Sequence, residues 1–242
     1  MKNLLTIVVY CNSDTGSSTL YDGIELIYPV DREPEAEFTS RAIKDACGKY
    51  IVLLGQKFKF ADVSPLLNIL DKNSPDIVTF TGGTAIKASI VKAAAKHSPD
   101  IFSCNILSIL DCKSVLKSNY TPFAFEKTEA IFTETNYNGL LTAAKEFIAI
   151  KAKLSKDIYS LVMNALCQRL IIFYLTAMLG IKNGDIKSEP LIEFDSKLKG
   201  EIVLYLALEK NFKYANLTKL RKKGFKISAF RAMKFKKALK LQ

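Results

Sequence analysis

Two adjacent glycines, Gly82 and Gly83, precede Thr84 between an expected strand and an expected helix. Backbone N–H groups at a glycine-rich helix start can bind phosphate, because they point at the ligand from the positive end of the helix dipole. The segment has neither the Lys-Ser/Thr of a P-loop nor the third glycine of a dinucleotide fingerprint. We therefore favour a simple turn with Thr84 as the N-cap of a helix reaching about Lys96; an anion site is the alternative.

The cysteines and the histidine indicate no metal site. Five cysteines are scattered along the chain and form no Cys-x-x-Cys pair, so neither zinc binding nor a disulfide framework is indicated. The single histidine, His97, stands at an expected helix end, where a surface role is commoner than catalysis. A reducing cytoplasm fits this cysteine usage best.

The net charge of +11 comes from the end of the chain. Residues 210–242 contain twelve basic residues and no acidic ones, whereas residues 1–209 carry 23 basic and 24 acidic residues. Apolar residues such as Ile227, Phe230 and Met233 recur among the lysines at roughly helical spacing. The pattern predicts a basic amphipathic helix over residues 226–242, at the end of the segment that we call the basic tail (residues 210–242).

Three roles are open for the basic tail. It can lie on an anionic membrane, where each Lys or Arg near the surface contributes about 1 kcal/mol. It can also pack on the rest of the chain with its basic face in water. Binding to nucleic acid or another acidic partner is the least favoured of the three.

Export and membrane insertion are both disfavoured. The apolar run at residues 4–10 is too short for a signal-peptide core and has no small-residue cleavage site. The apolar stretch at residues 161–181 contains Gln168 and Arg169 near its middle, which is costly at the centre of a bilayer. We expect a buried helix there and a cytoplasmic protein, peripheral on the inner membrane face if the basic tail binds lipid.

Expected strands and helices alternate in the first half of the chain, and these elements would position any site. This order predicts an α/β fold with a mainly parallel sheet flanked by helices. The second half reads as a helical C-terminal region, with a boundary near Asn136. Strands are expected at residues 4–10, 23–30, 49–54, 76–81 and 101–109, and helices at 38–47, 63–71, 84–96, 111–116, 137–153, 156–179 and 198–211.

Three segments resemble family 2 glycosyltransferases. Residues 6–12 look like the family's first strand ending in a Tyr-Asn turn, with a cysteine inserted, and residues 25–31 look like its second strand ending in an acidic residue. Residues 46–54, Ala-Cys-Gly-Lys-Tyr-Ile-Val-Leu-Leu, resemble the segment that leads into the family's Asp-x-Asp. The resemblance covers about residues 4–135, which it implies to be a GT-A-like (Rossmann-like) domain that binds a nucleotide-sugar. Residues 136–242 then form a helical extension carrying the basic tail.

The resemblance implies a donor site at the carboxyl ends of the strands, formed by Tyr10, Asn12 and Asp31, and we add Lys57 as a candidate. The resemblance does not extend to the family's metal ligands, because Gly55-Gln56-Lys57 stands where the family has Asp-x-Asp. Those carboxylates hold Mg²⁺ or Mn²⁺, whereas glycine offers no side-chain ligand and lysine repels the ion. We therefore expect no divalent metal at this position.

Lys57 has three interpretations. It can replace the cation by contacting the diphosphate, it can belong to a non-catalytic relative that still binds a nucleotide, or it can be a solvated loop residue, which is the favoured interpretation. The alternation Lys57-Phe58-Lys59-Phe60 fits a strand as well as it fits an anion site.

The general base is implied by the same resemblance. An inverting transferase needs a carboxylate within hydrogen-bond reach of the acceptor hydroxyl. The family uses an Asp that follows a Glu, and the resemblance places Glu129 at that Glu and Ala130 at the Asp. Glu126 and Glu134 are nearby alternatives, and Glu129 is the residue that we select.

Three classes of function follow. The first is a glycosyltransferase, or an inactive relative that partners an active transferase, using a nucleotide diphosphate sugar and a hydroxyl acceptor in surface polysaccharide synthesis. The second is a non-enzymatic module whose basic tail binds nucleic acid, a membrane or an acidic protein. A third is an unrelated α/β nucleotide-binding enzyme that uses Gly82 and Gly83.

Overall fold

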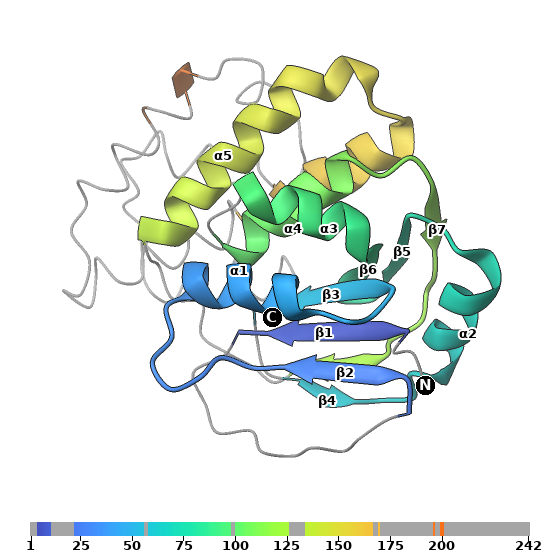
Figure 1. Ribbon diagram of the computed structural model, residues 1–242. Helices are drawn as coiled ribbons and strands as arrows, with labels where there is room; N and C mark the ends of the chain where they lie inside the picture. The colour runs from blue at the N-terminus through green and yellow to red at the C-terminus, as the bar shows by residue number, and fades with distance from the viewer. Residues whose placement is uncertain are drawn as a thin grey trace, which may run out of the picture. The chain divides into compact units, whose positions relative to one another are not determined.

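The structure of the chain is a computed structural model. It describes residues 4–10, 22–55, 58–97, 100–125 and 134–166, with a few single positions beyond them. The chain divides into two compact units, Met1–Thr128 with Leu154–Ile158, and Glu129–Lys153 with Tyr159–Gln242. The sheet and the helices beside it lie in the first unit (Figure 1).

The first unit is built on a six-stranded sheet in the order β2-β1-β3-β6-β5-β7. Strand β1 pairs in parallel with both β2 and β3, while β6 is antiparallel to its neighbours β3 and β5. Strand β7 is parallel to β5, so five strands share one direction and β6 alone runs against them. The strands are β1 Leu5–Val9, β2 Ile24–Ile27, β3 Tyr50–Leu54, β5 Ile77–Phe80, β6 Gly83–Lys87 and β7 Val115–Lys117.

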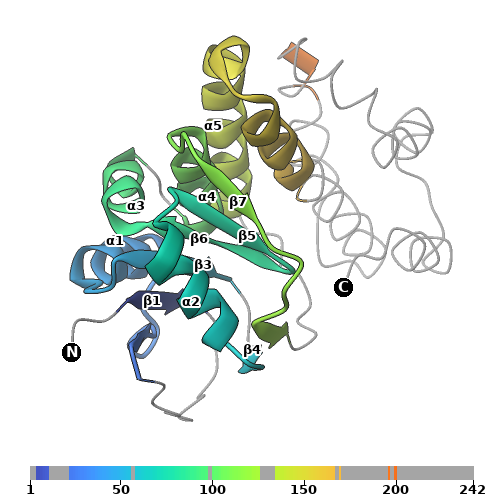
Figure 2. The same ribbon diagram turned by 90° about the vertical axis from the view of Figure 1, so that its right-hand side faces the viewer.

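Helices cover both faces of this sheet, with α1, α3 and α4 on one face and α2 on the other (Figure 2). Alternate residues of a strand point to opposite faces, so Leu5, Ile7 and Val9 form one core with Leu66 and Leu70 of α2. The intervening positions face the other three helices. The bounds are α1 Glu35–Asp45, α2 Ser64–Asn73, α3 Ala88–Ala94 and α4 Ile101–Leu110, with a 3₁₀ turn, η1, at Ala95–His97.

A two-stranded antiparallel ribbon joins β4 (Phe58–Phe60) to β8 (Phe123–Phe125). Phe123 is fully buried, and its ring packs edge-to-face with those of Phe58 and Phe80. Because Phe80 belongs to β5, this aromatic cluster anchors the ribbon to the main sheet.

The expected α/β fold with a mostly parallel sheet flanked by helices is confirmed, as are the first four strands and the helices at residues 38–47 and 63–71, within a few residues at their ends. Three expectations are wrong. Gly83 begins a strand, β6, and not a helix; residues 101–109 form helix α4 and not a strand; and residues 115–117 form strand β7 where a helix was expected. Strand β6 pairs with β5 across a tight turn and with the more distant β3, β7 pairs with the distant β5, and α4 is mostly buried.

In the second unit, α5 spans Glu134–Ile150 and continues into a 3₁₀ turn, η2, at Lys151–Lys153. A further helix covers residues 156–166, of which the residues from Tyr159 onward belong to this unit. Phe147 of α5 contacts Tyr159 with ring centroids 5.3 Å apart. The basic tail lies outside the described residues, as does most of the expected helical region after residue 166. Among the helices that are described, none is long and apolar enough to cross a membrane.

Candidate ligand site at the carboxyl edge of the sheet

Three parallel strands end together at one edge of the sheet. The register aligns Val8 with Ile27 and Val9 with Leu54, so the carboxyl ends of β1, β2 and β3 lie side by side. Strand β2 follows β1 on one side, and the chain then crosses through α1 to place β3 on the other side. Ligands of open α/β sheets bind outside such a switch point, where the connections diverge. We call this region the carboxyl edge.

Tyr10 stands at the carboxyl end of β1. Its backbone N–H donates to the Leu54 carbonyl at 2.9 Å, which continues the pairing of β1 and β3 by one residue. Its ring packs on Phe38 of α1 with centroids 5.5 Å apart, and its hydroxyl donates to the Glu33 carbonyl at 3.5 Å. Burial is the main cause that raises the pKa of Tyr10, with Glu35 and Glu33 adding to it. The phenol is therefore a neutral hydrogen-bonding group at this edge.

Asp31 lies in a four-residue turn that follows β2, residues 30–33, which we call the 30–33 turn. The Glu33 N–H donates to the Val30 carbonyl at 3.1 Å and closes the turn. Asp31 and Arg32 occupy its two central positions and are exposed. Arg32 has φ of 54°, a left-handed conformation that is uncommon for a residue with a Cβ atom.

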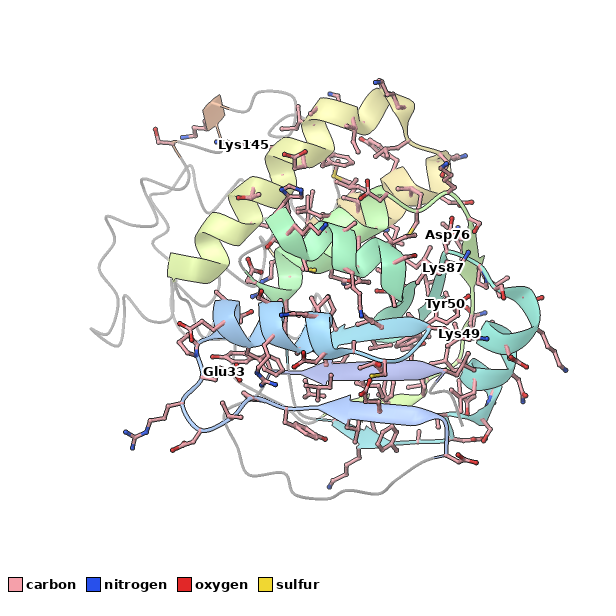
Figure 3. All side chains as sticks on the ribbon, in the orientation of Figure 1. Glu33, Lys49, Tyr50, Asp76, Lys87 and Lys145 are labelled. Carbon is pink, nitrogen blue, oxygen red and sulfur yellow. The ribbon has the colours of Figure 1, made fainter. Side chains whose placement is uncertain are left out.

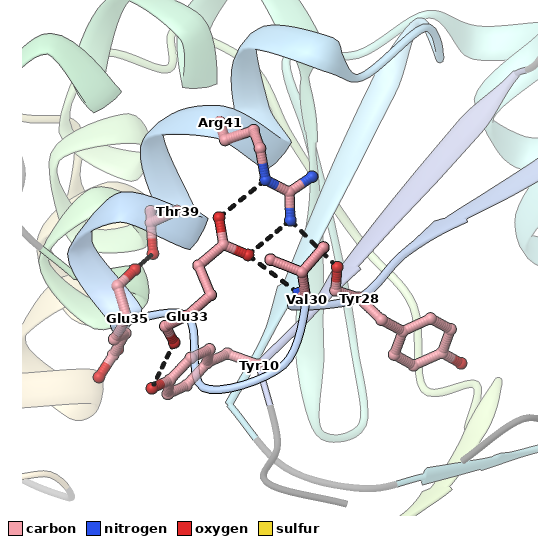
Figure 4. Close-up of polar contacts among 7 residues, drawn as sticks. All are labelled: Tyr10, Tyr28, Val30, Glu33, Glu35, Thr39 and Arg41. Atoms are coloured by element: carbon pink, nitrogen blue, oxygen red, sulfur yellow. Dashed lines mark hydrogen bonds and ion pairs between the residues drawn. The ribbon is translucent and has the colours of Figure 1, made fainter. Parts of the chain in front are cut away.

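The closing residue of this turn, Glu33, is fixed by Arg41 of α1 (Figure 4). Arg41 Nε donates to Glu33 Oε1 at 2.8 Å and Arg41 Nη2 donates to Oε2 at 2.6 Å, the two-point geometry that suits a guanidinium and a carboxylate. Oε2 also accepts the Val30 N–H at 3.1 Å, and Arg41 Nη2 reaches the Tyr28 carbonyl at 3.2 Å. The Glu33 side chain is 9% exposed, and the Arg41 hydrogen bonds lower its pKa.

Sequence reasoning missed Glu33 and Arg41. The only local signal is that Glu33, Glu35 and Glu37 gather at the start of α1, which reads as a favourable interaction with the helix dipole. The pairing of Glu33 with Arg41 depends on the angle at which the 30–33 turn leads into α1. No spacing rule in the sequence gives that angle.

The other predicted site residues fall outside the described residues. Asn12, Lys57 and Glu129 belong to this group, together with the alternative Glu126. The ribbon register nonetheless pairs Phe58 with Phe125. Phe58 is the first described residue after Lys57, and it therefore lies opposite Phe125, the last described residue before Glu126. The structure thus describes Tyr10 and Asp31 of the predicted set, both at the carboxyl edge.

The segment that best matched the glycosyltransferase pattern, residues 46–54, has a structural explanation. A Cβ atom on Gly48 would lie 2.5 Å from the Thr6 backbone nitrogen, so only glycine fits there. The Gly48 N–H donates to Thr6 Oγ1 at 2.8 Å, and Thr6 Oγ1 donates to Glu25 Oε2 at 2.6 Å. Tyr50 is buried and its hydroxyl donates to the Pro75 carbonyl at 2.9 Å. The close approach of Gly48 to β1 therefore explains the glycine, and the burial of Tyr50 with its hydrogen bond to Pro75 explains the tyrosine.

Gly82 and Gly83 do not form an anion site at a helix start, and Thr84 is not an N-cap. Gly82 has φ of 93° in the tight turn between β5 and β6, and Phe80 pairs with Gly83 across that turn. Thr84 lies within β6, where its hydroxyl contacts Asn105 Oδ1 at 3.0 Å. Because the segment after these glycines is a strand, the proposed use of a helix dipole there is ruled out.

The expected surface role of His97 is supported, since His97 is exposed at the end of η1. Among the described cysteines, Cys47 is exposed and Cys104 and Cys112 are buried, and each of the three carries a thiol and not a disulfide. Burial raises the pKa of the Cys112 thiol to about 12. Within the ranges that the structure describes, no group of three or more His, Cys, Asp or Glu side chains could hold a metal ion.

The carboxyl edge and the amino edge of the sheet carry different polar clusters. Glu33 lies at one end of the strands, whereas Asp76, Lys87 and Tyr50 gather at the other (Figure 3). At the amino edge, Asp76 Oδ1 accepts from Lys87 Nζ at 2.8 Å and Oδ2 accepts the backbone N–H groups of Lys113 and Ser114. These partners occupy both of its oxygens, so this cluster ties strands together. The carboxyl edge, with exposed Asp31 and Arg32, is the candidate ligand site.

The chain was compared with models of known protein families, with curated protein sequences and with solved structures, and none of them matches it.

Proposed function

We propose that the chain binds a nucleotide diphosphate sugar at the carboxyl edge, as a GT-A-like glycosyltransferase or as an inactive relative of one. The observation that carries the proposal is the joint ending of β1, β2 and β3 at a switch point, with Tyr10 and Asp31 at that edge. Nucleotides commonly bind α/β sheets at such a point. The mixed six-stranded sheet is also compatible with the GT-A-like assignment.

In this proposal the nucleoside contacts the end of β1 and the 30–33 turn. Tyr10 offers a neutral hydroxyl and an aromatic ring, and Asp31 offers an exposed carboxylate that can accept hydrogen bonds from ribose hydroxyls or from a base. Tyr10 and Asp31 follow adjacent paired strands, so one small ligand can reach both. Asn12 belongs to the same proposed donor site.

The diphosphate in this proposal is held without a metal ion. Strand β3 ends at Leu54 and is followed by Gly55, where the resemblance would place the first metal-binding carboxylate. Lys57 then supplies positive charge to the leaving diphosphate. If the protein is active, Glu129 accepts the proton of the acceptor hydroxyl as that oxygen attacks the sugar carbon and the diphosphate departs. If it is inactive, binding of the donor is retained and the protein serves as a partner subunit.

Calorimetry of uridine, guanosine, cytidine and thymidine diphosphates tests this function, with and without Mn²⁺, on the protein and on Lys57→Ala. Binding that does not need Mn²⁺ and that weakens about tenfold in Lys57→Ala is expected, which corresponds to about 1.4 kcal/mol. Binding that depends on Mn²⁺ would contradict the metal-free site. If none of the four nucleotides binds, the proposal is wrong.

A second candidate function is binding to an acidic partner through the basic tail. The observation that favours it is the concentration of twelve basic residues in residues 210–242. Vesicles containing an anionic lipid are the preferred probe, and RNA is the comparison. Removal of residues 210–242 should abolish this binding and leave nucleotide binding unchanged. Loss of both on truncation would contradict the assignment of the two activities to separate parts of the chain.

A further inference from the structure

The 30–33 turn is stabilised by one side chain from a different element. Glu33 accepts both the Val30 N–H and two N–H groups of Arg41, and Arg41 also donates to the Tyr28 carbonyl just after β2. Arg41 thus contacts the chain before the turn and the residue that closes it. These contacts attach the turn to α1 at two points.

The turn needs such support because of Arg32. Its φ of 54° lies in the left-handed region, which only glycine, and less often Asn or Asp, occupies without a steric penalty. Residues held there persist where the surrounding contacts over-determine them. The Glu33 carboxylate is nearly buried, at 9% exposure, and the Arg41 guanidinium also packs 5.6 Å from the Phe38 ring centroid. Glu33 and Arg41 are therefore each held by more than one contact, although the Arg41 side chain is 37% exposed.

The central residue Asp31 gains its position from this arrangement. Its side chain is exposed at the tip of the turn, so packing against neighbouring side chains does little to fix its position. Its placement at the carboxyl edge is set by the backbone of residues 30–33, which Glu33 and Arg41 hold.

We propose that Arg41 is a positioning residue, whose paired contacts with Glu33 and Tyr28 hold the 30–33 turn in the shape that presents Asp31 to the nucleoside. The inference rests on the proposed function, because Asp31 acts there as a ligand-binding residue. Lysine cannot replace arginine in this role, because its single ammonium group cannot bridge both carboxylate oxygens and the carbonyl in a fixed plane. Arg41→Lys therefore keeps the charge and removes the positioning.

The test is a double-mutant cycle on nucleotide binding, with Arg41→Lys and Arg32→Gly as the single variants and uridine diphosphate as the first probe. Arg41→Lys should weaken binding about tenfold. This is the loss expected if the fraction of molecules whose 30–33 turn has the binding shape falls to about a tenth. Glycine adopts the left-handed conformation at no steric cost, so the turn then depends less on Arg41. In the Arg32→Gly background the effect of Arg41→Lys should shrink to about twofold. An equal loss in both backgrounds, or no loss in either, overturns the inference.

A second measurement needs no ligand. The one-bond Cα–Hα coupling of residue 32, measured by NMR in the full chain, distinguishes positive from negative φ. Arg41→Lys should move this coupling away from its positive-φ value, while circular dichroism shows that the fold is intact. An unchanged coupling overturns the inference even if the protein binds nucleotides. If the protein binds no nucleotide, the proposed function fails, and with it the role of Asp31 as a ligand-binding residue; a shifted coupling would then assign Arg41 to the turn alone.

Discussion

Thr6 of β1 and Gly48, which precedes β3, are in direct contact. The Gly48 N–H donates to Thr6 Oγ1 at 2.8 Å, and a Cβ atom on Gly48 would lie 2.5 Å from the Thr6 backbone nitrogen and 2.7 Å from Oγ1. Both residues are buried. This contact fixes how the chain passes from α1 into β3, and therefore where β3 ends at the carboxyl edge.

We predict that Gly48→Ala lowers the free energy of unfolding by about 3 kcal/mol, because the clash is with backbone and cannot be relieved by a rotamer change. The matched control is Gly55→Ala, since a Cβ atom on Gly55 meets nothing within 4 Å and should change stability by less than about 0.5 kcal/mol. Urea denaturation of both variants measures the difference. Equal stability of the two variants would show that the Thr6 contact is not tight in solution.

Acid sensitivity is predicted from Asp76. Its hydrogen bonds to Lys87, which contribute most, and to the N–H groups of Lys113 and Ser114 lower its pKa to about 2. A carboxyl whose pKa is lower in the folded state stabilises the fold above its unfolded pKa, and this contribution is lost as pH falls from about 4 towards 2. Asp76→Asn should therefore cost about 2 kcal/mol near pH 7 and much less near pH 2.

The control for this prediction is Asp157→Asn. Asp157 accepts from Lys117 at 2.6 Å, yet the side chains of both residues are more than half exposed, and such surface pairs contribute little to stability. Denaturation of the two variants across this pH range separates them. A loss for Asp76→Asn that is independent of pH would contradict the electrostatic explanation.

The strands that form the carboxyl edge could be predicted from the sequence. Strand β3 is an unbroken apolar run and β1 is interrupted only by Thr6, as expected where both faces are covered by helices. Strand β2 is a short alternating segment before Pro29. These patterns are local, so they needed no knowledge of the tertiary structure.

The errors occurred where tertiary contacts decide the local structure. Residues 83–87, Gly-Thr-Ala-Ile-Lys, have no strong strand pattern, yet they lie between β3 and β5 and complete both ladders. The isoleucine-rich pattern of residues 101–109 favours a strand. They form a helix because most of their surface is buried, and because Asp100 caps it by accepting the Ser103 N–H at 2.9 Å. That Asp-x-x-Ser spacing, together with a length of ten residues, was the signal that could have identified α4.

The candidate site was predictable only in part. Tyr10 and Asp31 could be named because the glycosyltransferase resemblance marks the ends of the first two expected strands. Arg41 could not, because its partner lies eight residues earlier in the sequence and is brought to it by a left-handed turn at Arg32. Contacts that depend on one unusual backbone angle leave no periodic pattern in the sequence.

The most direct test of the central claim is an NMR footprint of uridine diphosphate on the isotopically labelled protein, repeated with the other three nucleoside diphosphates. The amide signals of Tyr10, Asp31 and Gly55 at the carboxyl edge should shift on titration. Those of Asp76 and Lys87 at the amino edge should stay in place. Shifts confined to the amino edge, or no shifts with any of the four nucleotides, would contradict a nucleotide site at the carboxyl edge of this sheet.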